Sequence, residues 1–376
     1  MSPDLTAAIS AAAIRHNVRL LRERTGPAVK LCAVVKADCY GHGLPPLMGL
    51  LEELADSLAV ATADEAIQLR RLGYEGPILM LLPPCGCGDR QQLRDMLVEL
   101  IAANVTLTVC RRAEIEAIAR GAGHVGGMGE VHVKIDTGMH RGGVEAGAAV
   151  ELIALARERA GVRLAGLYTH FAAADEADKT FTRRQLQCFV EVVEAAGGRS
   201  GLTLHAANSA AAIDLPETHL DMIRPGIAVY GCQPSAELAS HLPLRPALRL
   251  TAPLMLTKTV PAGGRCGYGL THTFPQAARI GLVPVGYGDG YPRCLSNRST
   301  MRIAGRDVPV RGRVSMDQVI VELTDVPEAG VGDEVEVICD DPAAPHSAEN
   351  LARLAGTIPY EITCALGRRA RRVLVD

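Results

Sequence analysis

The sequence predicts an α/β fold in which a (β/α)8 barrel is followed by a mostly β domain. Two observations lead to this prediction. Apolar runs rich in Val, Ile and Leu alternate with helix-like segments over the first two thirds of the chain, the pattern of a parallel barrel. After Pro246, short β-like runs separated by Gly and Pro turns replace the helical segments. An open doubly wound sheet is the alternative for the first part.

Eight apolar runs are candidate barrel strands. They cover residues 29–35, 57–61, 77–82, 105–110, 130–136, 164–171, 202–208 and 222–230. Segments with helical spacing lie between most of them, for example 89–100, 111–123 and 182–198. Several of these segments end on Gly, as helix C-termini often do. The order of runs and segments therefore predicts a parallel strand, an outer helix and the next strand in turn.

The change of pattern near Pro246 predicts two domains, a barrel over residues 1–245 and a β-rich domain over residues 246–376. The second domain has β-like runs at 250–260, 278–287, 301–324 and 333–340. Residues 4–10 also have a strand-like pattern, and we expect the first ten or so residues to add an edge strand to the β-rich domain.

Composition limits the classes of function. The chain has 376 residues, 48% of them hydrophobic, and a formal net charge of -3. It can bury a large core, and it has no excess charge to attract nucleic acid or an anionic membrane. No apolar run approaches the ~20 residues that span a bilayer, and the N-terminus has no export-signal pattern. We therefore expect a cytoplasmic protein that acts on a small molecule, with no nucleic-acid or membrane partner.

Two motifs that could suggest a ligand are weak. The eleven cysteines are scattered and odd in number, so we expect reduced thiols. Cys85 and Cys87 lack a second pair at zinc-ligand spacing, which predicts a turn there and no metal. The glycines of "GAGHVG" at 121–126 match a dinucleotide fingerprint, but they follow a helix pattern and precede a strand, the reverse of that site.

Polar residues stand where the candidate strands end. Lys36 closes the first strand, and a lysine at the end of a buried strand loses hydration unless something there uses its ammonium group. Catalytic groups of a barrel lie at the C-terminal ends of its strands, so we expect one shared mouth. The other residues at equivalent places are Arg141, His170, Asn208, Ser209 and Arg224. Taken singly, each has a simpler explanation, such as a lysine that extends to solvent.

The fifth candidate strand, 130–136, has a polar and an apolar face. Alternation places His132, Lys134 and Asp136 opposite Val131, Val133 and Ile135. We expect the polar set to face the barrel interior.

Nine segments taken together resemble, in order, the motifs of the bacterial alanine racemases. They are "AVVKADCYGHG", "KIDTGMHRGGV", "GLYTHFAAADE", "HAANSAA", "IRPGIAVYG", "GYGLTHTF", "VPVGYGDGYPR", "GRVSMDQ" and "IPYEITCALGRR". The resemblance covers nearly the whole chain, from about Arg15 to Arg372. The resemblance implies a barrel followed by a β domain, the cofactor pyridoxal 5'-phosphate (PLP), and a homodimer with shared active sites. It also implies racemisation of L- and D-alanine, which supplies D-alanine for peptidoglycan.

The resemblance assigns residues to the cofactor. Lys36 looks like the lysine that binds PLP covalently through its amine, so its proton must be lost well below the ordinary pKa of ~10.4. Arg224 matches the arginine that faces the pyridine nitrogen; it can only donate there, which weakens the ring as an electron sink and favours reprotonation at Cα. The remaining cofactor residues implied are Tyr40, Asn208, Ser209, Tyr360 and the backbone of Gly226 and Ile227.

The resemblance also implies a two-base mechanism, because racemisation removes a proton from one face of Cα and returns it on the other. Lys36 is one base, and Tyr268, from the opposite subunit, is the other. His170 would connect Arg224 to Tyr268. Substrate-binding residues implied are Arg141, Met316, Tyr287 and Asp317. In many relatives the lysine at the place of Lys134 is carbamylated; the alternative is an unmodified lysine paired with Asp136.

Some positions depart from the usual family pattern, and other functions stay open. Asp38, Cys39 and Gly142 replace more common residues next to Lys36 and Arg141. A serine racemase or a broad-specificity racemase is the main alternative, although Tyr360 favours alanine. Barrel decarboxylases fit less well because an acidic residue typically faces their pyridine nitrogen, where this chain has Arg224. A non-catalytic PLP carrier would lack the second domain. Nothing in the sequence separates a housekeeping from a catabolic enzyme.

Overall fold

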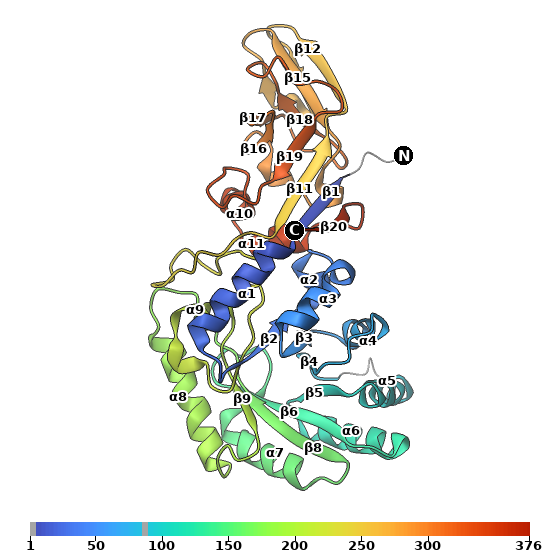
Figure 1. Cartoon of the computed structure of the whole chain (residues 1–376), viewed down its shortest axis with the longest axis vertical. Helices are drawn as coiled ribbons and strands as arrows, with labels where there is room; N and C mark the ends of the chain where they lie inside the picture. Colours follow the sequence, from blue (N-terminus) through green and yellow to red (C-terminus); the bar gives the residue numbers. More distant parts are fainter. Residues whose placement is uncertain (1–4, 85–88) are drawn as a thin grey trace.

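The computed structural model describes residues 5–84 and 89–376. The chain forms two parts, a barrel with helices around it and an elongated sheet that extends from one end of the barrel (Figure 1). The predicted turn at Cys85 and Cys87 lies outside the described residues. No helix within the described part of the chain is long and apolar enough to cross a membrane.

All eight predicted runs form strands of one parallel sheet. The strands are β2 (Lys30–Val34), β3 (Ser57–Val60), β4 (Ile78–Met80), β5 (Val105–Val109), β6 (Gly129–Asp136), β8 (Val162–Tyr168), β9 (Thr203–His205) and β10 (Met222–Ile223). Their order is β10-β2-β3-β4-β5-β6-β8-β9. Backbone hydrogen bonds from Asp221 to Leu204 (3.0 Å) and from Arg224 to Ala207 (2.9 Å) join the two ends. The sheet therefore closes into a barrel, and the open-sheet alternative is wrong.

Helices cover the outside of the barrel (Figure 1). They are α1 (Ala11–Thr25), α3 (Leu44–Leu54), α4 (Ala63–Arg71), α5 (Arg90–Ala102), α6 (Arg112–Val125), α7 (Ala146–Glu158), α8 (Thr180–Ala195) and α9 (Ser209–Asp214). The predicted segments 89–100, 111–123 and 182–198 are confirmed as α5, α6 and α8. Local sequence fixes where helices begin: Thr62 and Glu65 form a capping box at α4, and Asp89 accepts two backbone N–H groups at α5. A short strand, β7 (Val144–Glu145), pairs with β6.

The second sheet has nine strands in the order β12-β15-β18-β17-β16-β19-β11-β1-β20. They are β1 (Thr6–Ser10), β11 (Leu248–Pro253), β12 (Leu256–Val260), β15 (Ala278–Val283), β16 (Thr300–Ile303), β17 (Arg306–Arg311), β18 (Val319–Glu322), β19 (Glu334–Ile338) and β20 (Arg371–Val375). β1 joins this sheet as expected, but as an inner strand between β11 and β20 rather than at the edge. Two helices, α10 (Ala348–Ala355) and α11 (Pro359–Cys364), belong to the same part of the chain. The division near Pro246 stays a prediction.

The inward face of β6 is as its alternation predicts. The His132 ring lies 2.8 Å from the ring of His205 on β9, which is not a neighbour of β6 in the sheet, so the two rings meet inside the barrel. Val131, Val133 and Ile135 are fully buried on the opposite face, in the hydrophobic core. The barrel interior therefore contains a polar group of side chains under its mouth.

Candidate active site

Lys36 begins an unusual turn directly after β2. In the segment α2 (Lys36–Tyr40), the next four residues have φ of +52° (Ala37), +55° (Asp38), +56° (Cys39) and +54° (Tyr40). A left-handed conformation costs about 1–2 kcal/mol for each residue that has a Cβ. Four of them in succession persist only where surrounding contacts hold them, and such strain is typical of functional sites.

His42 and α11 hold this turn. The His42 Nδ1 lies 2.9 Å from the carbonyl oxygen of Cys39 and 3.1 Å from that of Tyr40. Because burial lowers the pKa of His42 to about 4, the ring is neutral, and its contacts with two acceptors place the proton on Nδ1. From the other side, a Cβ on Gly41 would lie 1.9 Å from the backbone oxygen of Thr363, so only glycine permits α11 to pack there. No sequence pattern indicates this support.

Lys36 and Arg141 form the electrostatic centre of the mouth. Burial lowers the pKa of the Lys36 amine, and the nearby Arg141 guanidinium lowers it further, while Glu65 opposes both. Arg141 is exposed and has no hydrogen bond or ion pair with any described residue. A free guanidinium beside an amine that loses its proton readily can bind the carboxylate of a small molecule whose other end reaches Lys36.

Lys134 is a third basic side chain at this mouth. Burial lowers the pKa of its amine, and Arg141 and Arg224 lower it further. The Lys134 Nζ lies 5.8 Å from the centre of the Tyr168 ring. Asp136 instead accepts backbone N–H groups from Gly138 and His140, and it forms no ion pair with Lys134 within the described ranges. The alternative in which Asp136 pairs with Lys134 is therefore not seen.

Arg224 is buried beneath the mouth, with an exposed fraction of 4%. Its Nη1 lies 2.7 Å from His205 Nδ1, and its Nη2 donates to the backbone oxygens of Thr169 (2.8 Å) and Ala206 (3.1 Å). No described residue accepts a hydrogen bond from its Nε. Of its five N–H groups, the Nε–H and one Nη1–H therefore remain for a ligand, and the other three fix its orientation.

The tautomers of the buried histidines follow from Arg224. Burial and the Arg224 charge hold the pKa of His205 well below its ordinary value, so the ring is neutral. Since Arg224 can only donate, His205 accepts at Nδ1 and carries its proton on Nε2, which donates to His132. His170 lies farther from Arg224, at 3.5 Å between Nδ1 and Nη2. Sequence alone does not identify His205 as a site residue, because a single histidine in an apolar strand looks like a core residue.

Hydroxyl and N–H groups gather where β10 ends. Ser209 Oγ accepts the Gly226 N–H at 2.9 Å, and a Cβ on Gly226 would lie 2.2 Å from the Tyr40 hydroxyl. The Tyr40 and Tyr360 rings are 5.9 Å apart, and neither hydroxyl has a hydrogen-bond partner among the described residues. The Ile227 N–H also has no hydrogen-bond partner among the described residues. The Asn208 side chain differs from this group, because its Oδ1 caps α9 by accepting the Ala211 N–H.

The remaining predicted residues lie on loops of the second sheet. Tyr268, Met316 and Tyr287 are exposed, with fractions of 71%, 54% and 44%. Two backbone hydrogen bonds join the loops of Tyr287 and Met316, from Tyr287 to Ser315 and from Gly288 to Met316. In the described structure, no hydrogen bond or ion pair connects the side chain of any of the three to the barrel mouth.

Asp317 anchors the loop of Met316. Its carboxylate pairs with Arg369 at 2.6 Å, and Arg369 also pairs with Asp289 at 2.8 Å. The structure thus holds the predicted residues as two groups, one at the barrel mouth and one on the second sheet.

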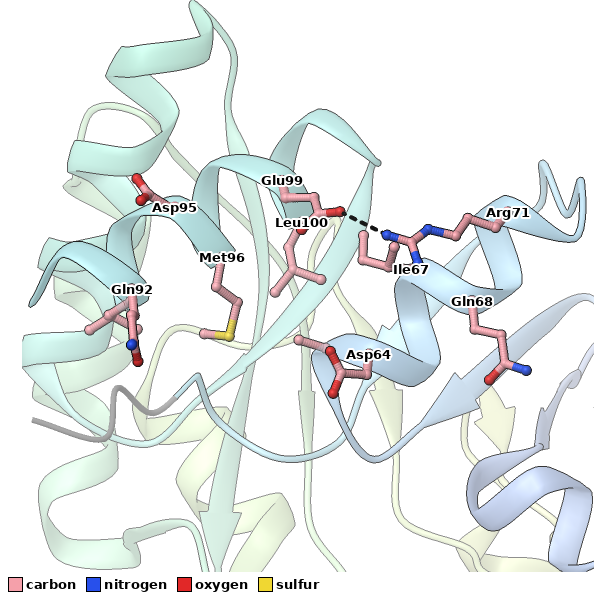
Figure 2. Close-up of a pocket in the computed structure, with 11 residues that line it drawn as sticks. Asp64, Ile67, Gln68, Arg71, Gln92, Asp95, Met96, Glu99 and Leu100 are labelled. Atoms are coloured by element: carbon pink, nitrogen blue, oxygen red, sulfur yellow. Dashed lines mark ion pairs between the residues drawn. The ribbon is translucent and has the colours of Figure 1, made fainter. Parts of the chain in front are cut away.

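A hollow lies on the outer surface, between α4 and α5. It has a volume of about 770 Å³ and is lined by apolar residues such as Ile67 and Met96 beside an ion pair of Arg71 and Glu99 (Figure 2). None of the predicted site residues lines it. Because the barrel mouth gathers the strained turn, the buried arginine and the amine with the lowered pKa, we assign the site to the mouth.

The fold and the mouth define a two-part barrel protein with a lysine-centred site. Family models for the alanine racemase N-terminal domain and the alanine racemase C-terminal domain match residues 9–234 and 247–374. The chain belongs to the alanine racemase family.

Relatives and solved structures agree over nearly the whole length. The chain is 42% identical to the alanine racemase of Desulforamulus reducens, with 100% of both chains covered, and 40% identical to that of Desulfosudis oleivorans, with 98% and 95% covered. The alanine racemase from D-cycloserine-producing Streptomyces lavendulae has a TM-score of 0.92 at 36% identity, covering 100% of this chain and 98% of that one. Alanine racemase of Clostridium difficile 630 in complex with cycloserine has a TM-score of 0.88 at 32% identity, covering 100% and 96%.

Proposed function

We propose that this protein interconverts L-alanine and D-alanine in the cytoplasm with PLP bound covalently to Lys36, and so supplies D-alanine for peptidoglycan. The observation that carries the proposal is that two groups lie near one another at the barrel mouth. The Lys36 amine has a lowered pKa, and the Arg141 guanidinium that helps to lower it has no hydrogen-bond or ion-pair partner among the described residues. One group suits an aldehyde cofactor and the other an amino-acid carboxylate. Membership of the alanine racemase family supports the same reaction.

The residues at the mouth fit PLP. The hydroxyls of Tyr40 and Tyr360 and the N–H of Ile227 are unpaired donors near Gly226, whose missing side chain leaves room for them. Neutral donors of this kind suit the phosphate dianion, and barrels commonly bind phosphate after strands seven and eight. The unused Nε of Arg224 would donate to the ring nitrogen. When bound, PLP withdraws electrons from Cα of the amino acid and makes its hydrogen acidic.

Two groups then move the proton. The Lys36 amine takes it from one face of Cα or returns it there, because its lowered pKa leaves the amine free of a proton nearer neutral pH. Tyr268 of the partner subunit serves the other face. Arg141 holds the substrate carboxylate, with the Met316 backbone and Tyr287 of the partner subunit beside it. His170, whose Nδ1 lies 3.5 Å from Arg224 Nη2, would connect Arg224 to Tyr268 of the partner subunit.

We propose a homodimer because the predicted site residues on the second sheet are exposed. Tyr268, Met316 and Leu270 present large side chains to solvent on one sheet, with exposed fractions of 71%, 54% and 47%. Exposed apolar surface of this kind is typical of an interface. In a head-to-tail dimer these loops would lie over the barrel mouth of the partner, and Asp317 would keep the Met316 loop in place through Arg369.

Lys134 is proposed to be carbamylated. Its amine has a lowered pKa, so it can attack carbon dioxide, losing a proton and becoming an anion. The anion would orient Arg141, whereas the free ammonium repels it. Crystals grown at ambient carbon dioxide should show three extra atoms on Nζ, and a bare amine in the electron density would contradict the modification.

Racemisation assays on alanine and serine test the function. The Tyr360 ring lies 5.9 Å from that of Tyr40 at the proposed cofactor site. We propose that it lies beside the substrate methyl, where a larger side chain would fit poorly, a discrimination worth about 1–3 kcal/mol. We expect L-alanine to be racemised with PLP present, L-serine slowly, and Tyr360→Asn to narrow the difference. Equal efficiency on both amino acids would favour a serine or broad-specificity racemase, and no racemisation of either would overturn the proposal.

A further inference from the structure

A second cluster of ligand-type side chains lies in the C-terminal sheet, outside the barrel mouth. Glu336 in β19, Cys339 just after it and His346 before α10 place a carboxylate oxygen, a sulfur and a ring nitrogen within 4.8 Å of one another. A bridge between Cys339 and Ser347 and a hydrogen bond from the Cys339 N–H to the His346 oxygen (3.2 Å) fix their relative positions. His346 is fully buried and Cys339 is 4% exposed.

The His346 ring has a buried nitrogen without a hydrogen-bond partner. Its Nε2 lies 2.9 Å from Glu336 Oε1. Because this carboxylate oxygen faces Nε2, a proton on Nε2 can donate to it. Nδ1 is then left with a lone pair, and the nearest carboxylate, Asp307 Oδ1 at 3.8 Å, cannot donate to it. A buried polar atom left without a partner is destabilising.

We propose that Glu336, Cys339 and His346 bind a divalent cation of the Zn²⁺ type, with water as the fourth ligand. Imidazole, thiolate and carboxylate are the ligands of tetrahedral zinc sites. The cation would replace the proton on His346 Nε2, and that proton would move to Nδ1, where it can bond to Asp307. A carboxylate behind a ligating histidine is a common feature of metal sites. The thiol proton goes to the solvent.

The neighbouring charges keep the ligand atoms available. Arg249 Nε holds Glu336 Oε2 at 2.5 Å, so Oε1, which faces His346 Nε2, is the oxygen that would bind the cation. Arg302 holds Asp307 Oδ1 at 2.8 Å and fixes the second carboxylate. A surface hollow of about 560 Å³ lined by Arg249, Arg302, Glu334 and Glu336 provides a route from solvent. The site would tie the end of β19 to the segment before α10 and has no contact with Lys36, so it is independent of the racemase proposal.

Cobalt and zinc titrations of the full-length holoenzyme test the site. We expect about one Co²⁺ per chain and, in difference spectra against the metal-free protein, a thiolate-to-cobalt charge-transfer band. Cys339→Ser and His346→Gln should abolish the band. Asp307→Asn should weaken binding about 10–100-fold. Cys188→Ser on α8 and His124→Gln on α6 are the matched controls, and they should leave both the charge-transfer band and the metal affinity unchanged. Thermal melts verify that each variant is folded.

Nitrogen NMR of His346 separates a cation site from a plain ion pair. In the metal-free protein we expect the proton on Nε2, and after Zn²⁺ is added we expect it on Nδ1 with a shifted Nε2 resonance. A doubly protonated ring that Zn²⁺ does not change would show an imidazolium held between Glu336 and Asp307, and would overturn the proposal. So would a cobalt band that persists in folded Cys339→Ser. Racemase activity should stay the same in every variant.

Discussion

Arg141 lies close enough to Lys36 to change the pKa of its amine. The amine must be free of its proton to bond to PLP, so uptake of PLP by the apo-protein should rise as pH rises through the Lys36 pKa. Burial and the Arg141 charge lower that pKa, and removing the charge must raise it again. Arg141→Gln should therefore move the rising limb of the uptake rate to higher pH. The rate is followed by the change in PLP absorbance.

The control for this experiment is Arg120→Gln, which removes an exposed arginine of α6 that forms no ion pair with any described residue. In this variant, the PLP uptake rate should rise over the same pH range as in the wild type. If the rise of the PLP uptake rate in Arg141→Gln stays at the wild-type pH or moves to lower pH, Arg141 does not lower the pKa of Lys36.

Residue patterns predicted which side chains meet at the mouth, but not what supports them. Lys36, Arg141 and Arg224 could be found because polar side chains at strand ends of a barrel face the same mouth. His205 and His42 could not, because their roles depend on the ring nitrogens that face Arg224 and two backbone oxygens. Such contacts arise between strands distant in sequence, or from a turn whose backbone shape was unknown.

At the scale of elements, the left-handed turn of α2 is the feature that no sequence rule anticipates. Ala37, Asp38, Cys39 and Tyr40 all carry a Cβ, and propensity assigns positive φ to glycine or asparagine. Tertiary contacts override this preference, since His42 bonds to two carbonyl groups of the turn and α11 packs on Gly41. The barrel strands were predictable because eight apolar runs repeat regularly, whereas α10 and α11 were not expected in a β-rich domain.

Gly226 tests how closely the elements approach at the proposed phosphate site. A Cβ there would lie 2.2 Å from the Tyr40 hydroxyl and would push it away. Gly226→Ala should lower PLP affinity at least tenfold, the equivalent of about 1.4 kcal/mol. The matched control is Gly49→Ala in α3, where no atom beyond the neighbouring residues and backbone of the same helix lies within 4 Å of the added methyl group. It should bind PLP normally and stabilise the helix by up to about 1 kcal/mol.

Equilibrium titration of each apo-protein with PLP measures the PLP affinity of Gly226→Ala and of Gly49→Ala. Thermal unfolding measures the stability of both variants. Equal PLP affinity for Gly226→Ala and the wild type would place the phosphate elsewhere.

At the scale of the whole molecule, the two groups of proposed site residues lie on different parts of the chain. Lys36 is at the barrel mouth and Tyr268 is on the second sheet, with 71% of its surface exposed. If subunits share sites, mixing inactive Lys36→Ala with inactive Tyr268→Ala should restore activity, because each hybrid dimer contains one site with both bases. Sedimentation should show dimers. No recovery after proven subunit exchange, or full activity in monomers, would reject shared sites.

The position of covalently bound PLP tests the central claim most directly. Borohydride reduction of the holoenzyme fixes PLP to the lysine that carries it, and peptide mapping then identifies that residue. We predict the label on Lys36, the amine at the end of β2 with a pKa lowered by burial and by Arg141. Lys36→Ala should carry no label and Lys258→Ala should be labelled as the wild type is. A label on Lys134 or Lys258 in the wild-type protein, or none on Lys36, would contradict the account.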